Sequence, residues 1–227
     1  MSGGLFITGT GTDVGKTFLS GLILKKLRES GCSAAYYKAA MSGNDRRPDG
    51  SLIPGDALYV KWASGIDQPI EEMCPFVYQA AVSPHLAAQW EGNPVCLERV
   101  LQGFQALSSR YDFITMEGSG GILCPLRFDG EELWLSDVIR ACGLGCLLVA
   151  DAGLGAINAA GLTAYYLKEQ GIPLKGIILN RFQPENPLHQ DNAAMCEHLT
   201  GANVIARVQR GAASLEIPVQ TLQALYE

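Results

Sequence analysis

Residues 4–17 read GLFITGTGTDVGKT, and this stretch decides the fold class. An apolar run gives way to a loop of glycine and threonine, which ends in Gly15, Lys16 and Thr17. Because such a loop carries few side chains, its backbone N–H groups can turn towards an anion, and the helix that follows presents its positive end to the same anion. The Lys16 ammonium then reaches the β- and γ-phosphates of a nucleotide, and the Thr17 hydroxyl binds Mg²⁺. The stretch therefore predicts a phosphate-binding loop.

The loop is one residue longer than the simplest phosphate-binding pattern. That pattern has glycine five positions before Gly15, where this chain has Thr10, and Gly9 lies one position further back. A glycine-rich turn that binds nothing is the alternative. It is disfavoured because an apolar strand, the loop, Gly-Lys-Thr and an amphipathic helix over 17–29 follow one another in the order that phosphate binding requires.

Size and composition favour one compact domain over residues 1–227. The chain is 48% hydrophobic, which suits a core of ordinary size. Its formal net charge of −6 weighs against nucleic acid or an acidic membrane surface as a partner. No segment resembles an export signal or approaches membrane-spanning length, so we expect a protein that is neither exported nor embedded in a membrane.

Cysteine and histidine usage gives no sign of a disulfide framework or a transition-metal site. The seven cysteines are odd in number and form no CxxC pair. Cys196 and His198 lie close in sequence, but such a pair on a helix is far more often packing than zinc binding. We therefore expect a reducing, cytoplasmic setting.

Short apolar runs alternate with amphipathic stretches along the rest of the chain. Strands are expected at 34–37, 113–116, 146–150, 176–179 and 203–206. Helices are expected at 56–65, 83–90, 95–107, 133–142, from within 150–161 to 170, at 188–199 and at 219–226. This order predicts an α/β protein, a single-domain, doubly wound parallel sheet with helices on both faces, like that of P-loop NTPases. The ligand crevice of such a sheet lies outside the carboxyl ends of its strands.

Charged side chains stand where the expected strands end. Lys38 ends the second strand and Ser42 follows it; a lone lysine there is usually a solvated charge, but the nearby phosphate loop favours a functional role. Glu117 leaves a buried strand into a run of glycines at 118–121, which cost chain entropy and bury nothing. A ligand against the backbone explains that run, and Glu117 supplies a carboxylate for Mg²⁺. Asp56 begins a helix, where aspartate serves as an N-cap, and that role is compatible with ligand binding.

With these pieces placed, the chain resembles the dethiobiotin synthetase family over nearly its whole length. The resemblance rests on GTGTDVGKT at 9–17, YKAAMSG at 37–43, GDAL at 55–58, MEGSGG at 116–121, LGAIN at 154–158 and LKGIILNR at 174–181. It implies an ATP-dependent ligase of biotin biosynthesis, in which 7,8-diaminononanoate takes up CO₂ as a carbamate. ATP then phosphorylates the carbamate, and the second amine closes the ring, which gives dethiobiotin, ADP and phosphate.

The resemblance also implies roles for individual residues. Lys16 and Lys38 are the implied catalytic pair, which neutralises the transferring phosphoryl group and the carbamate. Thr12 and Ser42 are implied to hydrogen-bond the carbamate or the diamine. The implied ligands of the Mg²⁺ cofactor are Thr17, Asp56 and Glu117. The implied nucleotide-binding residues are Asp13, Val14, Gly15, Lys16, Thr17, Phe18, Asp56, Glu117, Gly118, Ser119, Gly120, Asn180, Arg181, Gln209, Arg210 and Gly211.

Two further implications concern the base and the second subunit. Asn180 is implied to lie against the adenine, and the 209–211 loop to cover it. Members of the family are homodimers with the site at the interface. A helix start in one subunit therefore receives the substrate carboxylate bound to the other. The residues of that helix start are Gly155, Ala156, Ile157 and Asn158.

Several positions depart from the family pattern. Gly11 stands where aspartate is typical, and Asp13 where glutamate is frequent. Ala39 follows Lys38 in place of a common proline, Ala159 replaces a frequent histidine, and the stretch 208–211 lacks a proline often found there. None of these changes removes a charged group that the chemistry requires.

Other classes share parts of this pattern. A partitioning ATPase has an additional lysine early in its loop, and this loop has none before Lys16. A GTPase switch has Asn-Lys-x-Asp after a late strand, where residues 180–183 read NRFQ. A corrin-type amidase needs a glutaminase domain, for which the chain is too short. A P-loop ligase with another amine or carboxylate substrate stays open, as does the choice among ATP, GTP and CTP.

Overall fold

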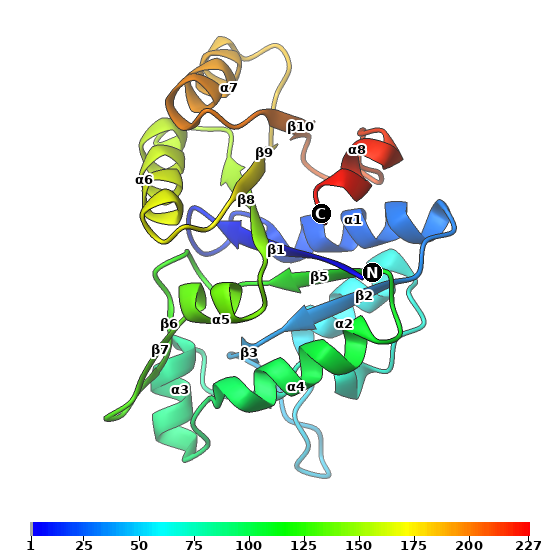
Figure 1. Ribbon diagram of the computed structural model, residues 1–227, viewed down its shortest axis with the longest axis vertical. Coiled ribbons are helices and arrows are strands. Elements are labelled where there is room, and N and C mark those ends of the chain that lie inside the picture. The colour runs from blue at the N-terminus through cyan, green and yellow to red at the C-terminus, as the bar shows by residue number, and fades with distance from the viewer. Residues whose placement is uncertain (1) are drawn as a thin grey trace.

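A six-stranded parallel sheet forms the centre of the protein, in a computed structural model that describes residues 2–227. The strand order is β10-β9-β8-β1-β5-β2 (Figure 1). The strands are β1 (Gly3–Gly9), β2 (Ala34–Lys38), β5 (Phe113–Glu117), β8 (Gly145–Asp151), β9 (Leu174–Asn180) and β10 (Val204–Val208). Each neighbouring pair is parallel, which confirms the expected α/β class.

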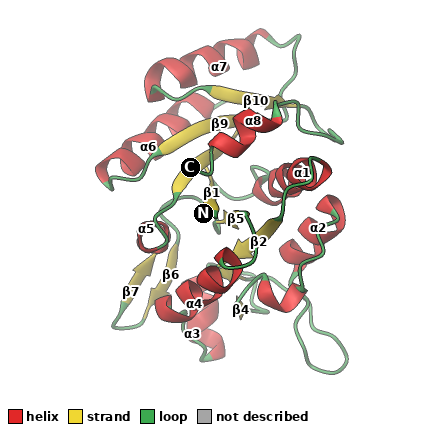
Figure 2. Cartoon of the chain, turned by 45° about the vertical axis from the view of Figure 1, so that its right-hand side comes forward, coloured by secondary structure: helices red, strands yellow, loops and turns green. Residues whose placement is uncertain are grey.

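Helices cover both faces of the sheet, as the sequence predicts (Figure 2). They are α1 (Lys16–Glu29), α2 (Gly55–Ser64), α3 (Pro84–Glu91), α4 (Leu97–Ser108), α5 (Leu135–Ala141), α6 (Ala156–Glu169), α7 (Pro187–Thr200) and α8 (Val219–Ala224), with a short 3-10 turn at Ile70–Glu72. One face carries α1, α2 and α8, and the other carries α4 and α5 beside α6 and α7. No helix within residues 2–227 is both long and apolar enough to cross a membrane.

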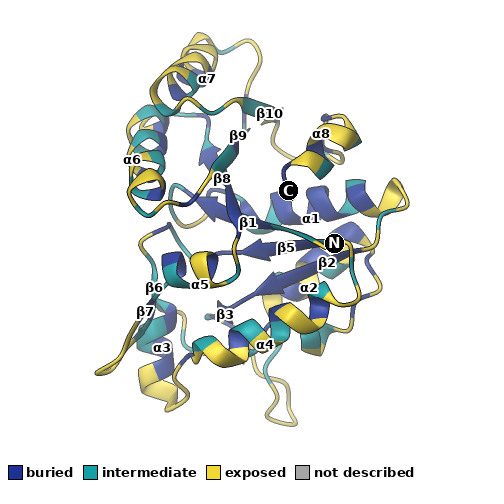
Figure 3. Ribbon diagram, in the orientation of Figure 1, coloured by how far each residue is buried: buried dark blue, intermediate teal, exposed yellow. Residues whose placement is uncertain are grey.

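Apolar side chains point alternately to the two faces of the sheet, which explains why helices cover both faces. Leu5 and Ile7 of β1 enter the core beneath α1, whereas Phe6 between them enters the core beneath α5. All three side chains are fully buried, as are most residues of the central strands (Figure 3). A strand that is apolar on both sides needs a layer of helices on each side.

The strand register aligns the ends of β1, β2 and β5, so that the loops that follow them start side by side. Glu117, the last residue of β5, pairs with Ile7 of β1 on one side and with Lys38 of β2 on the other. The order in which the strands are added also reverses beside β1, since β5 and β2 lie on one side of β1 and β8 to β10 on the other. A crevice outside the carboxyl ends at such a point is the usual ligand site of an open parallel sheet.

The sequence did not indicate four short strands. β3 (Ala40–Met41) pairs in parallel with β4 (Phe76–Val77), and β6 (Pro125–Phe128) forms a hairpin with β7 (Glu132–Trp134). The expected helix at 133–142 is wrong at its start, because Leu133 and Trp134 pair with β6 and α5 begins only at Leu135.

The N-cap role expected for Asp56 is also wrong. α2 begins at Gly55, Pro54 occupies the N-cap position, and Asp56 is the second helical residue. Its carboxylate instead pairs with the Lys38 ammonium. The charge of Asp56 is therefore directed at the crevice.

Candidate active site

A pocket of about 590 Å³ lies at the carboxyl ends of β1, β2 and β5, beside the start of α1. It is lined by Thr12, Asp13, Gly15, Lys16, Thr17, Phe18, Lys38, Met41, Ser42, Asp56, Glu117, Ser119, Gly120 and Arg181. Met41 apart, every one of these residues belongs to the predicted site. Separate segments of the chain thus converge on one pocket.

The loop after β1 has the backbone shape of an anion cradle. Asp13 and Gly15 have positive φ angles of 60° and 100°. Gly15 holds the N-cap position of α1 and has no side chain with which to cap the first N–H groups, so those groups are left for a ligand. A Cβ atom on Gly15 would lie 2.1 Å from Nδ2 of Asn180, so glycine is required here by both φ and space.

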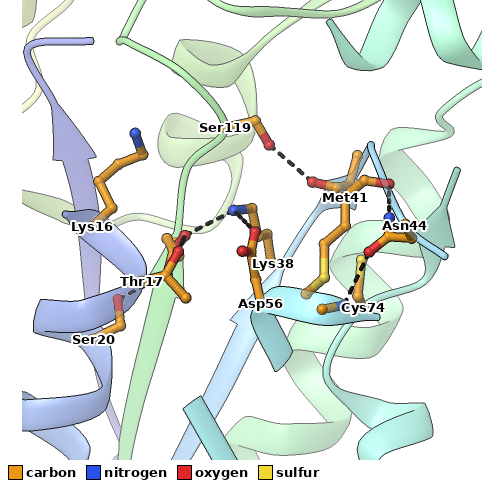
Figure 4. Close-up of polar contacts among 12 residues, drawn as sticks. Lys16, Thr17, Ser20, Lys38, Met41, Asn44, Asp56, Cys74 and Ser119 are labelled. Atoms are coloured by element: carbon orange, nitrogen blue, oxygen red, sulfur yellow. Dashed lines mark hydrogen bonds and ion pairs between the residues drawn. The ribbon is translucent and has the colours of Figure 1, made fainter. Parts of the chain in front are cut away.

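Lys38 lies between two carboxylates (Figure 4). Its Nζ is 2.6 Å from Oδ2 of Asp56 and 2.7 Å from Oε1 of Glu117. Burial acts to lower the pKa of Lys38, but the charges of Glu117 and Asp56 outweigh it and hold the pKa above its ordinary value. Lys38 is therefore a cation at any working pH.

Lys16 is the second buried ammonium of the pocket. Its Nζ donates to the Gly11 carbonyl at 2.8 Å. Burial and the nearby charge of Lys38 lower the pKa of Lys16, and the opposing attraction of Glu117 is smaller. Two ammonium groups held close enough to repel one another form a strong site for a polyanion.

The oxygen ligands present fit Mg²⁺. The Thr17 hydroxyl donates to Oε1 of Glu117 at 2.8 Å, and the Asp56 carboxylate faces the same oxygen across the Lys38 ammonium. The pair of carboxylates thus already accommodates a cation, in the form of that ammonium. Residues 2–227 contain no cluster of three or more His, Cys, Asp or Glu suited to a metal, but Mg²⁺ at nucleotide sites takes only one or two carboxylates plus phosphate and water.

Two hydroxyl groups that the sequence did not indicate hold the other oxygen of Glu117. Ser20 Oγ donates to Oε2 at 3.0 Å, and Tyr36 Oη donates to it at 3.1 Å. With Oε2 occupied, Oε1 faces the pocket. Spacing offers a signal in hindsight, since Ser20 follows Thr17 by three residues on a helix and Tyr36 precedes Lys38 by two on a strand.

A smaller pocket of about 270 Å³ adjoins the first and suits a nucleotide base. Its lining residues are Gly15, Phe18, Asn180, Arg181, Arg210 and Gly211. Asn180 Nδ2 donates to the Val14 carbonyl at 2.9 Å. Gln209, which was predicted to contact the base, does not line this pocket. It lines a neighbouring pocket, to which Arg210 also contributes.

Two predicted residues of the glycine run have contacts outside the pocket. A Cβ on Gly118 would lie 2.9 Å from the Phe6 ring, so this glycine allows close packing of β5 on the core. The Ser119 hydroxyl donates to the Ala40 carbonyl at 2.8 Å, which fastens the run to β3. Gly120, with a φ of 60°, turns the chain along the pocket wall.

The predicted carboxylate-binding residues lie apart from this pocket in the single chain. Gly155, Ala156, Ile157 and Asn158 form the start of α6, and Asn158 lines a separate groove of about 710 Å³ beside α6 and α7. Exposed apolar side chains precede and follow this helix start, with Leu154 90%, Leu162 62% and Tyr165 65% exposed.

The parallel sheet, the phosphate loop and the carboxylate at the end of β5 define a P-loop nucleotide-binding protein. A family model described as "AAA domain" matches residues 3–214. The chain is 40% identical over 228 residues to the ATP-dependent dethiobiotin synthetase BioD of Brachyspira hyodysenteriae, with 100% of each chain covered. It is 43% identical over 230 residues to the synthetase of the same name from Clostridium botulinum, with 100% of this chain and 99% of the relative covered. The chain belongs to the dethiobiotin synthetase family, which confirms the resemblance read from its motifs.

A solved structure shares the fold at much lower identity. The ParA family ATPase from Chlorobium tepidum superposes with a TM-score of 0.56 and 16% identity, over 100% of this chain and 91% of the ATPase. At that identity the likeness concerns the fold alone.

Proposed function

We propose that the protein is an ATP-dependent dethiobiotin synthase, which carboxylates 7,8-diaminononanoate with CO₂ and closes the ureido ring with release of ADP and phosphate. Family membership supports the reaction. The observation that carries it is the placement of Lys16 and Lys38, two buried ammonium groups on either side of one pocket at the phosphate loop. Such an arrangement suits a reaction in which an anionic carbamate meets an anionic phosphoryl group.

The proposed steps need cations and positioning but no protein nucleophile. One substrate amine adds to CO₂ and loses a proton, which gives a carbamate. A carbamate oxygen attacks the γ-phosphorus and ADP leaves; the second amine then attacks the carbamoyl carbon, and phosphate and a proton leave as the ring closes. Lys16 and Lys38 neutralise charge in the phosphoryl transfer and in the ring closure, and Thr12 and Ser42 line the pocket as hydrogen-bonding partners. Thr17, Asp56 and Glu117 would hold Mg²⁺, which would supply positive charge at the triphosphate.

The base pocket supports ATP as the nucleotide. Asn180 uses one N–H of its side-chain amide on the Val14 carbonyl, so its Oδ1 and its second N–H are left for a base. Adenine offers an exocyclic amino group to this Oδ1 and a ring nitrogen to this N–H. We therefore propose adenine as the base, with Phe18 and Arg181 as further walls of the base pocket.

We also propose that the working unit is a homodimer in the cytoplasm. Leu154, just before α6, and Leu162 and Tyr165 along that helix are exposed and apolar, which supports a second copy of the chain as the covering partner. Such a copy would bring Gly155 to Asn158 to the pocket of its neighbour, where the helix start suits a substrate carboxylate. All seven cysteines are free, which suits a reducing compartment.

A direct assay tests this function. Purified protein with Mg²⁺, ATP and isotope-labelled bicarbonate should release ADP only when the diamine is present, and the label should appear in the cyclic product. A monoamine analogue is the matched control, because it can be carbamated but cannot close a ring. ADP release independent of the diamine, or no label in the product, would overturn the proposal.

A further inference from the structure

Asp13 and Arg181 share an uncommon backbone conformation and contact each other. Their φ angles are 60° and 56°, and among residues 2–227 they are the non-glycine residues with positive φ. Arg181 Nη2 donates to the Asp13 carbonyl at 2.5 Å. Because a left-handed conformation costs a non-glycine residue free energy, two such residues in contact at a binding pocket point to a functional constraint.

Consecutive residues at the end of β9 hold consecutive carbonyls of the phosphate loop. Asn180 donates to the carbonyl of Val14, and Arg181 donates to that of Asp13. Within a trans peptide the N–H points opposite to the C=O. With both carbonyls held towards β9, the N–H groups of Val14 and Gly15 are turned the other way, as an anion cradle requires.

Asp151 fixes the guanidinium that makes this contact. Its Oδ2 lies 2.6 Å from Arg181 Nη1, while its Oδ1 accepts the N–H of Gly153 at 2.9 Å. Asn192 of α7 donates to the carbonyls of Ala152 and Gly153 at 2.9 and 2.8 Å, which fastens the same turn. Asp151 lines neither the phosphate pocket nor the base pocket.

We propose that Arg181 and Asp151 form a positioning pair, which shapes the phosphate loop before the nucleotide arrives and ties it to the turn preceding α6. The inference rests on the proposed nucleotide site. A simpler role for Arg181 is to attract phosphate by its charge. The two roles differ at Asp151, because its negative charge opposes attraction of an anion but is needed to hold the guanidinium in place.

The test measures MgADP affinity by calorimetry in the full-length protein. Arg181→Met and Asp151→Asn should each weaken MgADP binding about tenfold. The double variant should bind little more weakly than either single variant, because both substitutions disrupt the same contact with the phosphate loop. Arg181→Lys keeps the charge but loses the two-pronged contact, so it should not restore affinity. Arg110→Met is the matched control: it breaks an exposed ion pair with Glu72, outside both pockets, and should bind like wild type.

Amide NMR relaxation gives a second readout, because a loop shaped by this pair is ordered before the nucleotide binds. Without nucleotide, the order parameters of the Val14 and Gly15 N–H groups should be lower in both Arg181→Met and Asp151→Asn than in wild type. Unchanged or tighter MgADP binding by Asp151→Asn, or full affinity in Arg181→Lys, would overturn the positioning role while the proposed function stands. If the wild-type protein bound no MgADP, both proposals would fall together.

Discussion

Lys38 offsets the charge of a buried carboxylate. Glu117 has a fully buried side chain, and its Oε1 is 2.7 Å from the Lys38 ammonium. An unpaired charge at such a depth is strongly destabilising, whereas a paired one is roughly neutral. The same ammonium is proposed to act in catalysis, so its stability role and its chemical role should be separable by measurement.

Lys38→Gln is expected to lower the free energy of unfolding by about 3 kcal/mol, because Glu117 loses its counter-charge. It should also lower kcat about a thousandfold, since one cation facing the phosphoryl group is lost. Lys16→Gln is the comparison: Lys16 contacts a carbonyl, so this variant should lose turnover with little loss of stability. Urea unfolding and ADP release measure the two effects. Equal stability losses in both variants would contradict the account of Lys38.

Tyr36 offers a test of how Glu117 is oriented. Removing its hydroxyl in Tyr36→Phe leaves Oε2 with Ser20 as its donor, so the Mg²⁺ concentration needed for half-maximal nucleotide binding should rise about tenfold. Tyr37→Phe is the control, because that hydroxyl donates to the Val100 carbonyl in the opposite core. Both variants should lose about 1 kcal/mol of stability. An unchanged Mg²⁺ requirement in Tyr36→Phe would show that Ser20 suffices.

The phosphate loop is the element whose shape the sequence most clearly predicts. Its glycines, Lys16 and Thr17 follow one another directly, so local spacing carries the information. Strands such as β5 were equally visible as apolar runs. The pairing of β3 with β4 was not, because two-residue strands lack a period and their partners are distant in the chain.

The rest of the site depends on contacts between elements. Ser20, Tyr36 and Asp151 reach their partners only when α1, β2 and β8 are assembled, and no local pattern marks them. The cap expected at Asp56 failed for a related reason: a distant lysine attracts its carboxylate away from the helix start. Motif spacing thus predicted residues that line the pocket, and tertiary packing determined the residues that hold them.

Gly15→Ala tests the shape of the loop as an element. The new methyl group would lie 2.1 Å from Asn180 Nδ2 at a φ of 100°, so the loop must shift, and nucleotide affinity should fall about a hundredfold. Gly31→Ala is the control, with a φ of 77° but no heavy atom within 4 Å of the added carbon among residues 2–227. It should cost about 1 kcal/mol of stability and leave nucleotide binding unchanged. Calorimetry with MgADP distinguishes them, and normal affinity in Gly15→Ala would contradict the cradle geometry.

At the scale of the whole molecule, the proposed dimer predicts that a monomeric variant still binds nucleotide but loses diamine-dependent ADP release. Leu162→Glu places a charge on the exposed apolar face of α6 and should convert a dimer to a monomer, as measured by light scattering. Nucleotide binding should persist, because one chain forms the phosphate pocket, while diamine-dependent ADP release should fall at least about tenfold. Trp62→Glu, on the exposed side of α2, is the control. A monomeric variant with full turnover would contradict a site shared between subunits.

We propose that a triphosphate lies at the start of α1, with Lys16 and Lys38 at its outermost phosphate. The most direct measurement is a crystal structure with a non-hydrolysable ATP analogue, Mg²⁺ and the diamine. We expect the γ-phosphate between the two lysines, with Mg²⁺ beside Thr17, Asp56 and Glu117. An empty pocket, or a nucleotide bound elsewhere while Lys38 keeps both carboxylates, would contradict it.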